Sequence, residues 1–325
     1  MNEGPAIKSY VLSLSLVWSA CNCSGKPIDS VVDTLMSQFS KSDVVALGEW
    51  HWTREDSDLR IQLIRHPKFA EKVRYVVTEC GNALHQGVLD RYVGGENVPK
   101  QELQKLWRDV TSPGGCDSPV YEQFLQEIRM VNGALTVNRK IRVLAGDYPI
   151  DWARITSPQE WSRISDARDF FAAKLIGREI LQKGRKALVV YGAGHIYRNM
   201  TELAPRNLVS LLDREFPGRI YGVIRLNGVY PENAKLDRMI PSGDRPVLLP
   251  LRGTAFGDLD ANAFISRNLP SRWFAEGLGI GRVADAGVYS GQVADTIVNP
   301  EPSTRDDAAY AAEKARRMQL IPRPQ

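Results

Sequence analysis

Short apolar runs alternate with longer amphipathic stretches along the chain, and this alternation constrains the fold more than any other feature. Five runs are rich in Val and are bounded by Gly or by charged residues. They lie at residues 43–48, 75–78, 141–145, 186–191 and 220–224. Runs of this length and composition are typical of buried strands. Two later runs, at residues 247–249 and 283–289, indicate further strands.

The stretches between the runs have apolar residues at helical spacing. They lie at residues 58–65, 120–137, 158–183 and 207–215. Ser157 and Pro158 predict where the third of these helices begins, because Ser caps helices and Pro is tolerated in the first turn. Strands that alternate with helices predict an α/β fold with a mainly parallel central sheet flanked by helices on both faces.

The composition is that of an ordinary globular protein. Of 325 residues, 43% are hydrophobic and 25% are charged, so the chain can bury a large core. We place a single domain at residues 27–299 and a peripheral or disordered tail at 300–325. Residues 230–245 and 252–275 are interpreted as long loops or a flap. The net charge of +4 is spread along the chain. It forms no concentrated Lys/Arg stripe, so we expect no nucleic-acid partner.

Residues 1–26 have the pattern of a leader peptide. Lys8 precedes an apolar run at 10–17, and small residues lead to Cys21. The pattern predicts a secretory or bacterial lipoprotein signal. We therefore expect an exported, periplasmic or membrane-anchored protein with a lipid on Cys21. If this segment is not a signal, the protein would be cytoplasmic.

Two further cysteines, Cys80 and Cys116, lie in the body of the chain. They could form one disulfide in an exported protein, but the sequence does not show that they meet. Because Cys80 directly follows an apolar strand, we expect it to be a free, buried thiol.

Four successive predicted strands are each followed by ionisable side chains. The first leads into Glu49 and His51, the second into Glu79, the third into Asp147 and the fourth into His195. In open α/β sheets the ligand crevice lies outside the carboxyl ends of the strands. These side chains therefore predict one shared polar site. For Asp147 alone, capping of the next helix is an equal alternative.

Several common catalytic motifs are absent from the sequence. It has no GxSxG nucleophile elbow, which disfavours a serine α/β-hydrolase. It has neither GxxxxGK[ST] nor GxGxxG, which disfavours nucleotide-dependent chemistry.

The remaining residue types suit a hydrolase. We expect His51 to act as a general base or a metal ligand, with Glu49 orienting it and with Glu79 and His195 completing the pocket. Two imidazoles and two carboxylates would also suit Mn, Co, Zn or Fe, which could then activate water. The expected metal ligands are His51, Glu79, Asp147 and His195. Two arginines just beyond the histidines could bind an anionic group or lie on the surface. They are Arg54 and Arg198.

Two GxxH elements, at residues 48–51 and 192–195, with Glu79 between them, resemble a broad superfamily. It joins the erythromycin esterases, the Tiki and TraB/PrgY proteins and the ChaN-like haem-uptake lipoproteins. The resemblance covers about residues 40–225, with a weaker echo near 285–289. It implies an α/β fold with the motif residues in one cleft.

The resemblance implies more than one activity. Erythromycin esterases hydrolyse a macrolactone ester with a His base and Glu support, but their motif has one more residue between Gly and His. The GxxH spacing is nearer to that of the metal-dependent Tiki peptidases and of ChaN. We therefore expect a hydrolase of an ester or amide bond in a small-molecule or peptide substrate. The alternative is a haem-binding envelope lipoprotein, with Tyr197 and Arg198 beside the cofactor.

Overall fold

The computed structural model describes residues 27–201, 206–226, 234–266, 273–291 and 296–322. Within them, seven strands form one sheet in the order β3-β2-β4-β1-β5-β7-β6. The strands are β1 Val44–Glu49, β2 Arg74–Asn82, β3 Arg142–Asp147, β4 Lys186–Gly192, β5 Ile220–Leu226, β6 Val247–Pro250 and β7 Ala286–Tyr289.

The sheet is parallel except at one edge. β1 lies at its centre and pairs in parallel with β4 and β5, and β2 pairs in parallel with β3 and β4. Only the edge strand β6 runs antiparallel, against β7. All seven predicted runs are strands, and the predicted α/β class with a mainly parallel sheet is confirmed.

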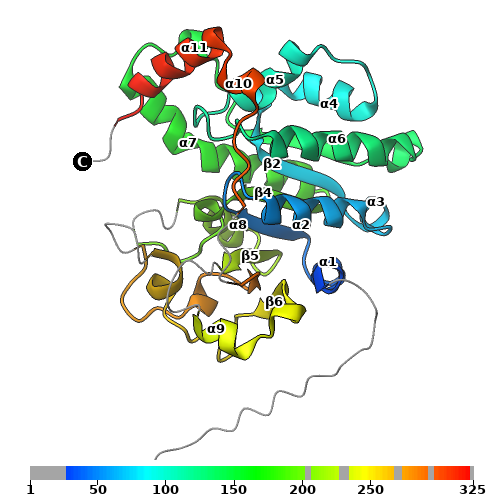
Figure 1. Cartoon of the computed structure of the whole chain (residues 1–325), viewed down its shortest axis with the longest axis vertical. Coiled ribbons are helices and arrows are strands. Elements are labelled where there is room, and N and C mark those ends of the chain that lie inside the picture. The colour runs from blue at the N-terminus through cyan, green and yellow to red at the C-terminus, as the bar shows by residue number, and fades with distance from the viewer. Residues whose placement is uncertain (1–26, 202–205, 227–233, 267–272, 292–295, 323–325) are drawn as a thin grey trace, which may run out of the picture.

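Helices cover both faces of the sheet. The helices are α1 Pro27–Gln38, α2 Arg54–Arg65, α3 Phe69–Lys72, α4 Gln86–Gly94, α5 Lys100–Arg108, α6 Pro119–Gly133, α7 Pro158–Ile176, α8 Leu208–Glu215, α9 Ala234–Met239, α10 Pro302–Arg305 and α11 Ala308–Gln319. Figure 1 shows α2 and α6 alongside β2 and β4. Because side chains alternate along a strand, β1 sends Val45 and Leu47 into one core and Val44 and Ala46 into the other.

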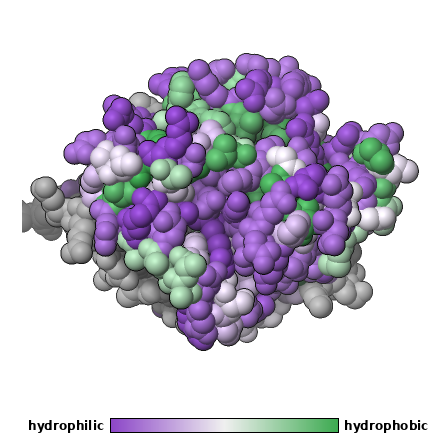
Figure 2. All heavy atoms as spheres, turned by 90° about the horizontal axis from the view of Figure 1, so that it is seen from above, coloured by the Kyte–Doolittle hydropathy of each residue, from purple (hydrophilic) through white to green (hydrophobic). Residues whose placement is uncertain are grey.

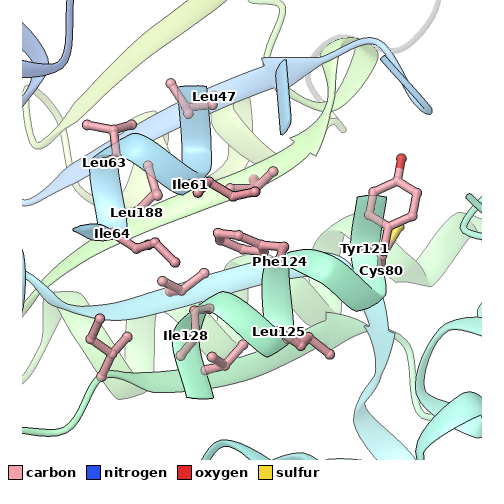
Figure 3. Close-up of a cluster of buried hydrophobic side chains, with 14 of the residues drawn as sticks. Leu47, Ile61, Leu63, Ile64, Cys80, Tyr121, Phe124, Leu125, Ile128 and Leu188 are labelled. Carbon is pink, nitrogen blue, oxygen red and sulfur yellow. The ribbon is translucent and has the colours of Figure 1, made fainter. Parts of the chain in front are cut away.

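The first core lies between the sheet and the helices α1, α2, α4, α5 and α6. In Figure 3, Ile61 and Ile64 of α2 and Phe124 and Ile128 of α6 pack over the strands. The second core includes buried residues of α7 and α8. The two layers bury the strands on both sides, which explains why the strands are apolar runs without polar alternation.

The predicted helix starts and ends are largely as expected. Ser157 caps α7 in a capping box with Glu160, and Pro158 occupies the first turn. The α-helix gives way to a π-helical turn at Gly177–Leu181, so it is shorter than the predicted 158–183. The helices α1, α3, α4, α5 and α9 were not predicted, and α9 lies within the segment 230–245 that was interpreted as a long loop or flap.

The tail contains the helix α11, which packs on the body of the molecule. Arg317 pairs with Asp109 at 2.8 Å, and the Tyr310 hydroxyl donates to Asp117 at 2.6 Å. Figure 2 looks down on this end of the molecule and shows a mainly hydrophilic surface with small hydrophobic patches. No described helix has the length and apolarity that a bilayer crossing requires.

The cysteine expectation is wrong for Cys80. Its sulfur is bonded to that of Cys116, 36 residues further along the chain. The bond joins β2 to the loop before α6, and both cysteines are buried. Sequence spacing could not show this contact, because the intervening α4 and α5 bring the loop back over the end of β2.

Candidate active site

The carboxyl ends of four adjacent parallel strands meet at one pocket of about 600 Å³. The strands β3, β2, β4 and β1 lie side by side, so the residues at their ends become neighbours. The pocket is lined by all five ionisable residues that the strand ends predicted, which are Glu49, His51, Glu79, Asp147 and His195. Its wall is largely apolar, with Trp50, Val110, Tyr197 and Trp273.

His51 is held through one ring nitrogen. Its Nδ1 lies 3.0 Å from Glu49 Oε1 and 2.8 Å from the Tyr121 hydroxyl, which itself donates to Glu49 at 2.9 Å. Arg60 pairs with the other Glu49 oxygen and is 2% exposed. In the neutral ring, this arrangement favours a proton on Nδ1 and leaves Nε2 as the acceptor. The His51 side chain is 37% exposed, so it can meet a ligand.

The Nε2 side of His51 faces Glu79. Nε2 lies 3.7 Å from Glu79 Oε2, and that oxygen accepts the Gly192 backbone N–H at 2.6 Å. A Cβ on Gly192 would lie 2.8 Å from His51 Nε2 and 3.3 Å from Glu79 Oε2. Only glycine at this position lets the end of β4 approach both side chains closely.

A second charged group comes from α7. Arg168 pairs with Glu79, donates to Ser112 Oγ at 3.0 Å, and places Nη2 2.5 Å from His195 Nε2. On the other side of the ring, His195 Nδ1 lies 2.5 Å from Asp169. Arg168 and Asp169 are adjacent in sequence, and each contacts a different ring nitrogen of His195.

These contacts shift the pKa values of the site in different directions. Burial would raise the pKa of Glu79, but His195, Arg168 and His51 together hold it well below its usual range. Burial lowers the pKa of His51, but Glu79 and Glu49 raise it by a larger amount. The net pKa is therefore above the ordinary histidine value. Glu79 and His51 therefore favour their charged forms.

His195 is the most perturbed histidine. Burial and Arg168 lower its pKa, but Asp169 and Glu79 outweigh them and raise it to about 9. A protonated ring cannot accept a hydrogen bond at Nε2. A hydrogen bond from Arg168 to His195 therefore requires the neutral ring, whereas Glu79 and Ser112 accept from Arg168 in either state of the ring.

Asp147 lines the pocket and does not cap a helix. Its carboxylate accepts the Thr111 backbone N–H at 2.5 Å and the Thr111 hydroxyl at 2.8 Å. Burial raises its pKa to about 6, although Arg168 and Thr111 oppose the rise. It anchors the loop of residues 109–118, which also contributes Ser112 to the pocket.

The raised pKa predicts a stability change with pH. The ordinary pKa of Asp is about 3.9, so the folded protein holds a proton on Asp147 more tightly than the unfolded chain does. The stability that this proton contributes is fully present below pH 4 and is lost as pH rises through about 6. A pKa difference of about two corresponds to on the order of 3 kcal/mol. We expect Asp147→Asn to match the wild type at pH 4 and to be more stable at pH 7.5, measured by urea unfolding. Exposed Asp166→Asn is the control, and an equal pH effect in both variants would contradict the prediction.

Two other arginines that the sequence singled out lie away from this pocket. Arg54 begins α2. Arg198 is buried against Asp213 at 2.5 Å and Asp285 at 2.8 Å, on a separate pocket. Arg198 thus joins Asp213 of α8 to Asp285, the residue before β7, and a role for it in anion or cofactor binding stays a prediction.

The residues that sequence analysis missed supply most of the contacts to the expected ones. They are Arg60, Tyr121, Arg168 and Asp169. Each lies on a helix whose pattern predicted only packing against the sheet. No local signal marks which polar residue of such a helix reaches the strand ends.

The expected metal ligands are poorly placed for a metal. Among the described residues, only Glu49, His51 and Cys80 bring three potential ligand atoms within 4.8 Å of one another. The positive charge of Arg168 lies against both Glu79 and His195 and would repel a cation there. A divalent metal bound by His51, Glu79, Asp147 and His195 stays a prediction.

Comparison with known proteins identifies the fold. The sequence matches no protein-family model and no curated protein. Among solved structures, a crystal structure of a Bacillus cereus protein is similar, with 13% identity, a TM-score of 0.54, and coverage of 84% of this chain and 95% of that one. The molecule therefore has an α/β fold that is already known.

The second similar structure is a mutant of the erythromycin esterase EreC in its open conformation. It shows 12% identity and a TM-score of 0.54, and the match covers 82% of this chain and 95% of the esterase. The α/β fold that the resemblance to the erythromycin esterases implied is thus confirmed.

Proposed function

We propose that the protein hydrolyses an ester or amide bond of a small-molecule or peptide substrate, with His51 as the general base. The observation that carries the proposal is the Glu49–His51 pair. A buried carboxylate holds Nδ1 at 3.0 Å while the ring stays exposed to a pocket of about 600 Å³. This is the arrangement in which an imidazole takes a proton from water. The fold shared with an erythromycin esterase agrees with it.

The reaction needs one water molecule. His51 Nε2 removes a proton from that water as its oxygen attacks the carbonyl carbon, and the carbonyl oxygen becomes an oxyanion. Arg168 lines the same pocket and is released from Nε2 of His195 when that ring is protonated, so its guanidinium can stabilise the oxyanion. Collapse of the intermediate breaks the bond to the leaving group, which takes a proton from His195.

The test is turnover of a panel of aryl esters, lactones and aryl amides of increasing chain length, carried out in ¹⁸O-labelled water. Direct attack by water predicts one label in the carboxylate product and no burst of the leaving group. Rates no higher than those in buffer across the panel would overturn the proposal. A burst would instead indicate a covalent intermediate.

The pKa of His51 predicts the pH dependence. A general base acts in its neutral form, so the rate should rise with pH, with a midpoint above about 6.5. Glu79 is the main group that raises this pKa. We expect Glu79→Gln to move the midpoint of kcat/KM to lower pH, whereas Glu127→Gln, a buried glutamate on α6, should leave it in place. A midpoint that does not move in Glu79→Gln would remove His51 as the titrating base.

Haem is the alternative cofactor that the sequence left open. Tyr197 lines the pocket, but Arg198 does not. The two imidazoles of the pocket contact Glu49, Glu79, Asp169 and Arg168. A haem titration separates the two functions, because a Soret shift at micromolar protein would favour haem binding over hydrolysis.

We also propose that the protein is exported. Disulfides persist in oxidising compartments, and the Cys80–Cys116 bond agrees with such a location. The predicted leader and the predicted lipid anchor at Cys21 lie outside the described residues. Detection of the chain in a membrane or periplasmic fraction, with loss of membrane binding in Cys21→Ser, would test the location.

A further inference from the structure

One half of the disulfide lies against the proposed catalytic base. Cys80 directly follows Glu79 on β2, and its sulfur, a ring nitrogen of His51 and a carboxylate oxygen of Glu49 all lie within 4.8 Å of one another. While the sulfur is bonded to Cys116 it carries no thiolate and cannot act as a strong metal ligand.

Reduction changes the chemistry of this group. A dithiol reductant gives two electrons and two protons to the Cys80–Cys116 bond, which becomes two thiols while the reductant becomes a disulfide. Although Cys116 is buried, it lines the pocket of about 600 Å³. A small dithiol can therefore reach the bond through the space that a substrate would use.

We propose that reduction of the Cys80–Cys116 disulfide creates a zinc site from Glu49, His51 and Cys80. Thiolate, imidazole and carboxylate are the usual ligands of zinc, which binds them at about 2.0–2.3 Å in tetrahedral geometry. Such bonds require ligand atoms about 3.5 Å apart. A sulfur released from Cys116 can turn to close the remaining distance, and its thiol loses a proton as the metal binds.

Arg60 contacts only one of the two oxygens of Glu49. Arg60 pairs with Oε2, which leaves Oε1 for a metal. Ligating carboxylates commonly have an outer partner of this kind, which orients them. Tyr121, whose hydroxyl lies 2.9 Å from Oε1, must yield that contact when a metal binds. These ligands differ from the four that the sequence predicted, which were His51, Glu79, Asp147 and His195. In the part of the chain that the structure describes, the hydrogen bonds of Arg168 go to Glu79, Ser112 and His195 and not to Glu49 or His51.

A matched pair of variants tests the site. Cys116→Ser and Cys80→Ser both remove the disulfide, but only Cys116→Ser keeps the Cys80 thiol. All proteins carry Cys21→Ser and Cys23→Ser so that these other cysteines cannot bind metal. The measurements are zinc content after gel filtration and the thiolate-to-cobalt absorption band with Co²⁺.

We expect about one zinc per chain and a cobalt band in Cys116→Ser without reductant, and in the protein with the disulfide only after reduction. Cys80→Ser should show neither, and His51→Gln should remove both from Cys116→Ser. Equal binding by the two cysteine variants, or none by Cys116→Ser, would overturn the proposal. If the cysteine variants fail to fold, the oxidised and reduced forms of the parent make the same comparison.

A second readout rests on the proposed hydrolase function. Zinc at this site would occupy His51, so stoichiometric zinc should lower ester hydrolysis at least tenfold in the reduced protein, and a chelator should restore it. The oxidised protein should not respond. If no hydrolysis is found at all, zinc content and the cobalt band still decide the site, so the two proposals fail independently.

Discussion

Replacing His51 with glutamine should abolish most of the hydrolytic activity. General base catalysis contributes about 10²–10⁴-fold, and an amide cannot take the proton from water. We therefore expect kcat to fall by that factor on the ester that the wild type turns over best. KM should change little, because most of the pocket surface is apolar and comes from other residues such as Trp50, Tyr197 and Trp273.

The control for this variant is His66→Gln. His66 follows α2, and its ring contacts Asp33 at 3.2 Å outside the pocket. We expect its kcat to equal that of the wild type. Near-UV circular dichroism should show that both variants keep the native packing. Retention of more than a tenth of the activity in a folded His51→Gln protein would transfer the role of base to another group, and His195→Gln would be the next variant.

Arg60→Met should cause the largest loss of stability. Arg60 is 2% exposed, pairs with Glu49, donates to the Val120 carbonyl at 3.0 Å, and lies about 5 Å from the rings of Tyr121 and Phe124. Methionine fills the space between the rings but leaves the carboxylate of Glu49 buried without its partner. Removing one member of a buried ion pair costs about 3–5 kcal/mol. Urea unfolding at pH 7.5 measures this loss.

The control for the size of the effect is Arg65→Met on the same helix. Its side chain is 47% exposed and pairs with Glu127, so we expect a loss of less than about 1 kcal/mol. The double variant Glu49→Gln/Arg60→Met also removes the buried negative charge of Glu49 and should recover part of the stability. A double variant no more stable than Arg60→Met would show that the cost comes from packing and not from the charge.

The loss should also depend on pH. In the wild type, burial raises the pKa of Glu49, but Arg60 and His51 lower it more, so the net pKa is below the usual value. This contribution to stability is present at neutral pH and is lost as pH falls through the lowered pKa. Without Arg60, the pKa of Glu49 should be higher than in the wild type, because one of the groups that lower it is gone. The deficit of Arg60→Met should therefore be largest at pH 7.5 and should shrink as pH falls toward 4.5.

The chain order of the strands and the position of the site could be predicted because both depend on local patterns. A strand that is buried on both faces must be apolar along its length, so β1, β2, β3, β4 and β5 are visible as Val-rich runs. The carboxyl ends of neighbouring parallel strands lie at one edge of the sheet. For this reason Glu49, Glu79 and His195 could be assigned to one site before the structure was known.

The tertiary structure decided which partner each of these residues has. Arg60 and Arg168 lie on amphipathic helices, and helical spacing shows the face of a helix but not its position along a strand. The pairing of Cys80 with Cys116 depends on how α4 and α5 return the chain to the end of β2. The sequence by itself determined the layers and the edge at which the site lies, because burial pattern and strand direction are local properties. The partners, the pKa values and the disulfide arise from contacts between segments far apart in the chain, and only the packing of the helices on the sheet brings those segments together.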